Sequence, residues 1–122
     1  MPKTKRLLTE AEAVILAALW ERPGQTMMEI TRAVERETAW SKHTVTTLLK
    51  RMIDKATVLM DDAGPVRRYS PAIDRETVKR METRSLLDRL FGGSPAALTR
   101  WLVESGELGR AELETILEDT KA

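Results

Sequence analysis

Residues 41–55 combine a clear helix start with two chemically opposite faces. Four apolar residues recur at the i, i+3, i+4 and i+7 spacing of one helix face, namely Val45, Leu48, Leu49 and Met52. Ser41 precedes them, and its hydroxyl can accept a hydrogen bond from a free backbone N–H of the first turn. The segment therefore predicts an amphipathic helix whose apolar stripe is buried by the rest of the chain.

The face opposite this stripe is polar. At about 100° per residue it carries His43, Thr47 and Lys50, with Thr46 and Arg51 on its flanks. No Asp or Glu occurs between Ser41 and Lys50. The major groove of DNA admits one helix, in which short polar side chains reach base edges while Lys and Arg contact phosphates. We therefore predict a DNA-binding face formed by Ser41, Lys42, His43, Thr44, Thr46, Thr47, Lys50 and Arg51. The alternative is a solvated face without a partner.

Two further helices are predicted before this one. Thr9 with Glu12, and Thr26 with Glu29, have the capping-box spacing of helix starts. Pro23-Gly24 ends the first segment. The expected apolar stripes are Ala13, Leu16, Ala17 and Trp20 in the first helix, and Met27, Ile30, Ala33 and Val34 in the second.

A short β-hairpin is expected after residue 55. Residues 57–60 are β-branched or apolar, residues 61–65 (DDAGP) are typical of a turn, and residues 66–70 can extend again. Adjacent Asp61 and Asp62 fit this turn better than an acid–base pair. Three helices followed by a hairpin form the winged helix-turn-helix order, in which the hairpin is the wing. We expect Arg67 and Arg68 to contact phosphates, although a basic strand edge that deters pairing is equally compatible with them.

The second part of the chain predicts helices alone. Helix-start signals at Asp74 and at Ser94-Pro95, with Gly92-Gly93 and Gly106 as breaks, divide it into three segments. Their apolar faces need cover from the first part of the chain or from a second copy, and we favour the second copy. The expected dimerisation residues are Leu87, Leu90, Phe91, Leu98, Trp101, Leu102, Leu113, Ile116 and Leu117. The predicted fold is mainly α, with a winged-helix DNA-binding domain at residues 1–72 and a helical dimerisation domain at residues 73–122.

Composition excludes most enzyme classes. The 122 residues contain no cysteine, which excludes thiolate metal sites, disulfides and a Cys nucleophile. They contain a single histidine, His43, on which any zinc hydrolase site or Ser-His-Asp triad would have to rest. We expect no catalytic residue, cofactor or metal. No apolar run approaches the roughly 20 residues of a membrane helix, so a cytoplasmic protein without a membrane partner is expected. Residues 1–71 hold twelve basic and nine acidic residues (+3), whereas residues 72–122 hold eight and ten (−2).

The ordered motifs resemble the penicillinase-repressor (BlaI/MecI) family of bacterial transcriptional repressors. The matching features are Leu8-Thr9 with Glu12, Leu16 to Trp20, Ser41 with Thr44-Val45, Thr47 to Leu49, Arg51-Met52, Lys55, Tyr69 to Pro71, Leu87, Leu90 to Gly93, Leu98, Glu107-Leu108 and Leu113. This resemblance implies a homodimer that represses promoters by binding an inverted-repeat operator in double-stranded DNA. It also implies target genes for β-lactamase or penicillin resistance, or the regulator's own operon, and release through the protease of a sensor system.

Two positions depart from the family pattern. Thr46 stands where better-known members carry a basic residue, and those members carry a different residue at Lys42 or His43, so their half-site sequence does not transfer directly. The Asn-Phe cleavage pair of the β-lactam-responsive members aligns with Trp101-Leu102, which lacks that chemistry. The copper-responsive branch uses C-terminal cysteines, which this chain does not have. The competing hypothesis is a winged-helix module whose third helix binds a protein instead of DNA.

Overall fold

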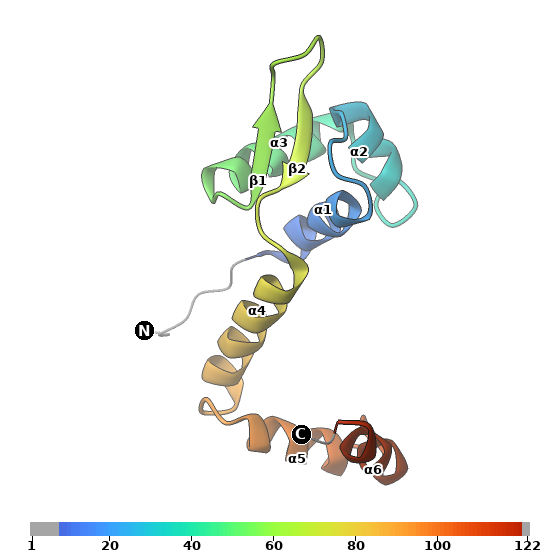
Figure 1. Ribbon diagram of the computed structural model, residues 1–122, viewed down its shortest axis with the longest axis vertical. Coiled ribbons are helices and arrows are strands. Elements are labelled where there is room, and N and C mark those ends of the chain that lie inside the picture. Colours follow the sequence, from blue (N-terminus) through green and yellow to red (C-terminus); the bar gives the residue numbers. More distant parts are fainter. Residues whose placement is uncertain (1–7, 121–122) are drawn as a thin grey trace. The chain divides into compact units, whose positions relative to one another are not determined.

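The computed structural model describes residues 8–120, and the chain divides into two compact units (Figure 1). The N-terminal unit comprises residues 8–82 of the described chain, and the C-terminal unit comprises residues 83–120. The elements of the N-terminal unit are α1 (Glu10–Glu21), α2 (Met27–Val34), α3 (Lys42–Asp54), β1 (Val58–Asp61), β2 (Arg68–Pro71) and the first part of α4 (Arg75–Leu90). The mainly helical winged helix-turn-helix prediction is confirmed.

The predicted caps begin the first three helices. Thr9 and Thr26 each accept a hydrogen bond from the backbone N–H three residues later, and the Glu at that position bonds back to the cap. Ser41 accepts from the backbone N–H of Thr44 at 3.3 Å. These local bonds satisfy N–H groups that lack a partner within the helix, so the start of each helix could be located from sequence.

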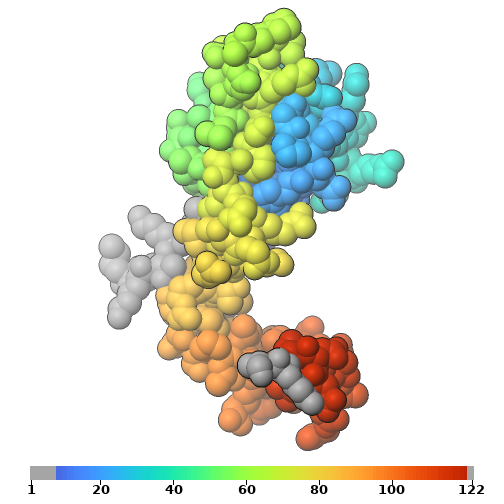
Figure 2. All heavy atoms as spheres, viewed as in Figure 1, coloured from blue at the N-terminus to red at the C-terminus, as the bar shows by residue number. Residues whose placement is uncertain are grey.

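The hairpin joins the helices through the turn between α1 and α2. β1 and β2 pair antiparallel, with Met60 opposite Tyr69. The outer side of β2 pairs with Gln25, because the N–H of Tyr69 donates to the Gln25 carbonyl at 2.8 Å and the Gln25 N–H donates back at 3.1 Å. β1 packs against α3, β2 packs against α1, and Figure 2 shows the yellow-green hairpin tip projecting beyond the helices of its own unit. The wing is therefore anchored at its base while its tip extends into solvent.

The core of the N-terminal unit lies between α1, α2 and α3. The four predicted α3 residues are buried, and so are Ile30 and Val34 of α2. In the rest of the predicted α2 stripe Met27 is half-buried, but Ala33 is exposed, so the prediction is wrong at Ala33. The predicted α1 stripe is partly wrong, because Ala13 and Ala17 are exposed and the buried side chains are Glu12, Ile15, Leu16 and Leu19. The larger side chains remove more apolar area from water than alanine does, so they determine which face of α1 is turned inward.

The C-terminal unit contains the rest of α4, α5 (Pro95–Glu104) and α6 (Arg110–Asp119). Ser94 caps α5 by accepting from the backbone N–H of Ala97 at 3.1 Å, as predicted. The rings of Phe91 and Trp101 meet edge to face, with centroids 6.2 Å apart. Neither α5 nor α6 has a buried residue. Among residues 8–120, no helix has the length and apolar character needed to span a bilayer.

Candidate nucleic-acid interface

Helix α3 presents the polar face that the sequence predicts. Lys42, His43, Thr46, Thr47, Lys50 and Arg51 are exposed, as is Ser41, whereas Thr44 is half-buried. The buried stripe on the opposite side, with Leu49 only 1% exposed, fixes which side of the helix faces solvent. In a single chain, the polar face of α3 is therefore accessible to a partner molecule.

Two threonines on this face already use their hydroxyl protons within α3. The Thr46 hydroxyl donates to the Lys42 carbonyl at 2.8 Å, and the Thr47 hydroxyl donates to the His43 carbonyl at 3.1 Å. A hydroxyl oxygen keeps lone pairs when its proton is donated, so each threonine still offers an acceptor together with a methyl group. These are groups that can contact base edges and the thymine methyl in a major groove.

Methionine 27 adjoins the same face and was not among the predicted site residues. Its Sδ lies 3.5 Å from the Thr46 hydroxyl oxygen. Because Met27 belongs to the first turn of α2, this contact places an apolar thioether beside the middle of α3. The sequence assigned Met27 only to the core stripe of α2, and no local spacing signals a contact 19 residues away.

The electrostatics of α3 favour an anionic partner. No Asp or Glu occurs from Ser41 to Ile53. Within residues 8–120, no ion pair engages Lys42, Lys50 or Arg51. Helix α3 carries these three exposed cations against the single carboxylate of Asp54 in its last turn, so its net positive charge attracts phosphate oxygens.

The two wing arginines differ in their surroundings. Arg67 is exposed in the segment just before β2. Arg68 lies at the start of β2, where its Nη1 donates to the Gly24 carbonyl at 3.0 Å and lies 3.8 Å from Glu29 Oε1. Phosphate binding by Arg68 would therefore compete with contacts inside the unit, whereas Arg67 has no ion pair within the described chain. Both assignments to DNA remain predictions.

Glu29 is the carboxylate at the base of the wing. It accepts from the Thr26 backbone N–H at 2.9 Å and forms an ion pair with Arg22 at 2.6 Å. The Thr26 hydrogen bond, followed by the charges of Arg22 and Arg68, holds the pKa of Glu29 below its ordinary value. The carboxylate therefore stays ionised at neutral pH and remains a partner for Arg68.

The turn of the wing supports the prediction that Asp61 and Asp62 are turn residues and not an acid–base pair. The Asp61 carboxylate accepts from the backbone N–H of Ala63 at 2.9 Å, which is the hydrogen bond of an Asx turn. Asp61 and Asp62 are both exposed. Among residues 8–120, no group of three or more His, Asp or Glu side chains is arranged to hold a metal ion.

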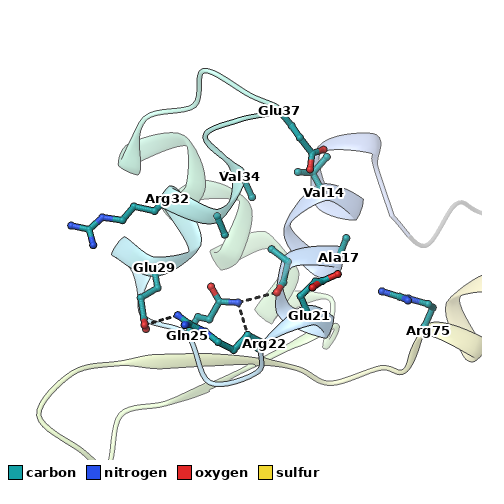
Figure 3. A pocket seen from close by; sticks show the side chains of 12 residues that line it. Val14, Ala17, Glu21, Arg22, Gln25, Glu29, Arg32, Val34, Glu37 and Arg75 are labelled. Carbon is teal, nitrogen blue, oxygen red and sulfur yellow. Dashed lines mark hydrogen bonds and ion pairs between the residues drawn. The ribbon is translucent and has the colours of Figure 1, made fainter.

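A separate hollow of about 590 Å³ lies between α1 and α2 (Figure 3). Its described lining contains none of the predicted DNA-contacting residues and carries charges of both signs, including Glu21, Arg32 and Glu37. Gln25 crosses its floor and donates through Nε2 to the carbonyls of Ala18 and Arg22. Mixed charge does not favour a polyanion, so α3 is the better DNA candidate.

The predicted dimerisation residues differ in exposure. Leu90, Trp101, Ile116 and Leu117 are exposed, Phe91, Leu98, Leu102 and Leu113 are half-buried, and Leu87 is buried within the chain. Trp101 is 52% exposed and Leu117 is 63% exposed. Large apolar side chains exposed on α5 and α6 are compatible with a second copy, and their role in an interface remains a prediction.

Comparison with known proteins agrees with this assignment of elements. The profile of the penicillinase repressor family matches residues 8–121. The chain is 25% identical to the penicillinase repressor of Bacillus licheniformis over 117 residues, covering 93% of this chain and 91% of that protein. It is 22% identical to the penicillinase repressor of Staphylococcus aureus over 109 residues, covering 89% and 86%.

A solved structure matches part of the chain. It is the solution structure of the Bacillus licheniformis BlaI monomeric form in complex with the blaP half-operator. The TM-score is 0.52 at 26% sequence identity, and the match covers 62% of this chain and 92% of that chain.

Proposed function

Because the chain belongs to the penicillinase repressor family, we propose that it is a sequence-specific DNA-binding transcriptional repressor that catalyses no reaction. The single observation that carries this proposal is the face of α3, which is exposed, basic and free of carboxylates from Ser41 to Ile53. The chain's likeness to the monomeric form of BlaI in complex with a half-operator gives further support.

The proposed contacts separate positioning from base reading. Lys42, Lys50, Arg51 and Arg67 contact phosphates, and Arg68 does so once it leaves Gly24 and Glu29. Ser41, His43, Thr44, Thr46 and Thr47 face the base edges. Phosphate contacts set affinity and register, whereas contacts to base edges set the preferred sequence.

We further propose that the protein acts as a homodimer. In this arrangement residues 1–72 bind one half of an inverted repeat, and residues 73–122 hold the two copies together. The exposed apolar side chains of α5 and α6 support this proposal, because a second copy would remove them from water. Two linked half-site contacts bind far more tightly than one, since the second binding event is intramolecular.

The proposed setting follows from the family relationship. The regulated genes are a β-lactamase or penicillin-resistance gene or the regulator's own operon, and the protein acts in the cytoplasm, where its operator lies. Residues 101 and 102 are Trp and Leu in this chain, where the β-lactam-responsive members carry the Asn-Phe cleavage pair. Release through the protease of a sensor system would therefore need a different cleavage site.

The test is binding of the full chain to DNA from upstream of its own gene, followed by fluorescence anisotropy. We expect saturable binding to this DNA, with at least about a thousandfold preference over a shuffled duplex of equal length. A variant with Lys50→Met and Arg51→Met should weaken binding to both duplexes. Equal, weak binding of the wild type to both duplexes, or no binding, would contradict the proposal and favour a protein partner for α3.

A further inference from the structure

Glu12 is a fully buried carboxylate that the helix cap alone does not explain. Its exposed fraction is 0%, although capping-box glutamates need only reach the first turn of their own helix. Its Oε1 accepts both from the Thr9 backbone N–H at 2.9 Å and from Lys55 Nζ at 2.7 Å. One oxygen therefore connects the start of α1 to a residue 43 positions further along the chain.

Lys55 is the C-cap residue of α3. Its backbone N–H donates to the Arg51 carbonyl at 3.0 Å, so it closes the last turn of that helix. Its side chain, 36% exposed, reaches inward to Glu12. The ion pair thus joins the first turn of α1 to the carboxyl end of α3.

The apolar core fixes which side of α3 is buried, but apolar contact is itself non-directional. A short charge-assisted hydrogen bond is directional, and burial makes the carboxylate costly to leave unpaired. Within the described chain, Glu12 Oε2 has no hydrogen-bond partner, so Lys55 supplies the only charged contact shown for this carboxylate. Burial is the largest single effect on the pKa of Glu12 and raises it, but the hydrogen bonds from Lys55 and Thr9 together with the Lys55 charge outweigh burial, so the pKa is lowered.

We propose that the Glu12–Lys55 ion pair positions α3 along its axis and thereby sets the sequence specificity of DNA binding without touching DNA. The inference rests on the proposed function. Base contacts by the short side chains of Thr44 and Thr47 fail when the helix shifts by about 1 Å, since hydrogen bonds tolerate only a few tenths of an ångström. The long Lys50 and Arg51 side chains follow a phosphate through the same shift, so affinity for any DNA would survive.

The experiment compares the wild type with a variant that carries both Glu12→Gln and Lys55→Met. Glutamine keeps an oxygen that can accept the Thr9 N–H, and the change removes one charge of each sign, so the net charge stays the same. Because neither substitution leaves a buried charge, we expect this variant to fold. The matched control carries Glu76→Gln and Lys79→Met, which remove the exposed ion pair of α4, whose atoms lie 3.2 Å apart.

Three quantities are measured for each protein: the affinity for operator DNA, the affinity for a shuffled duplex, and the salt dependence of both. For the Glu12/Lys55 variant we expect the ratio of the two affinities to fall at least about tenfold, comparable to losing one base-pair contact. The affinity for the shuffled duplex and the salt slope should match the wild type. The control variant should retain the wild-type ratio.

Three outcomes would overturn the proposal. A ratio within about twofold of wild type would show that the pair does not influence specificity. Equal weakening on both duplexes with a smaller salt slope would make Lys55 a phosphate contact. A variant that does not fold would make the pair an element of stability alone. If wild type itself shows no operator preference, the proposed function fails instead, so the two failures are distinguishable.

Discussion

Replacing Lys50 with methionine removes one exposed cation from the α3 face and keeps most of the apolar length of the side chain. Each phosphate neutralised by a protein cation contributes about −0.9 to the slope of log affinity against log salt. Four of the proposed phosphate contacts are exposed cations that form no ion pair within residues 8–120, namely Lys42, Lys50, Arg51 and Arg67. They predict a slope of about −3.6 for one chain on a half-site and about −7 for a dimer on a full operator.

These slopes translate into measurable losses of affinity. Between about 50 and 200 mM salt, binding should weaken roughly 150-fold on a half-site and about 2 × 10⁴-fold on a full operator. Lys50→Met should reduce the slope by about 0.9 on the half-site, and by twice that on the full operator, where both copies lose a contact. The same loss is expected on shuffled DNA, because phosphates are common to all sequences.

The assay is fluorescence anisotropy with a labelled duplex at five or more salt concentrations. Glu35→Gln is a suitable control, because Glu35 is the exposed C-cap residue of α2 and forms no ion pair within residues 8–120. It should leave the slope unchanged. A salt response that is nearly flat for wild type, or a slope that Lys50→Met does not alter, would refute the phosphate assignment.

Four further predictions test other parts of the molecule. Leu49→Ala should lower the free energy of unfolding by about 2–5 kcal/mol in urea titrations, and a loss below about 0.5 kcal/mol would contradict its place in the core. Thr47→Ala should change which base pair is preferred in competition assays, whereas equal losses on every duplex would exclude base reading. Leu117→Glu should halve the mass in sedimentation equilibrium if α6 forms the dimer, and an unchanged mass would remove it from the interface. The pKa of Glu12 in the folded protein is depressed below 4.5, so the stability that ionised Glu12 contributes is present above pH 4.5 and is lost as the pH falls through the lower folded pKa. The melting temperature of wild type should therefore fall more steeply below pH 4.5 than that of Glu12→Gln. Parallel curves for the two proteins would contradict this role of Glu12.

Local signals were sufficient for α3. The cap at Ser41, the apolar stripe and the carboxylate-free opposite face all lie within one continuous segment, so they could be read without knowledge of tertiary contacts. The capping boxes likewise located the starts of α1 and α2. Sequence reasoning succeeds here because both the hydrogen bonds and the periodicity involve residues three or four positions apart.

The buried face of α1 could not be predicted in the same way. A glutamate is among the residue types least often buried, so the sequence favoured a stripe through Ala13 and Ala17 rather than one through Glu12. The buried Glu12 pairs with Lys55, which lies far along the chain, and burial of Ile15 and Leu19 in the core turns the alanines outward. The contacts of Arg68 with Gly24 and Glu29 are equally non-local, because they depend on how the hairpin meets the turn after α1.

The salt arithmetic also constrains how such a repressor can be released from DNA. A single chain with about four phosphate contacts loses most of its affinity at physiological salt, so in the proposed homodimer occupancy would depend on linking the two copies. Linkage raises avidity by about 10²- to 10⁴-fold without any new contact to DNA. The exposed apolar side chains of α5 and α6, including Trp101 and Leu117, are the surface proposed to supply that link. Any event that separates the α5 and α6 helices of the two copies would therefore release the operator without any change in the structure of α3.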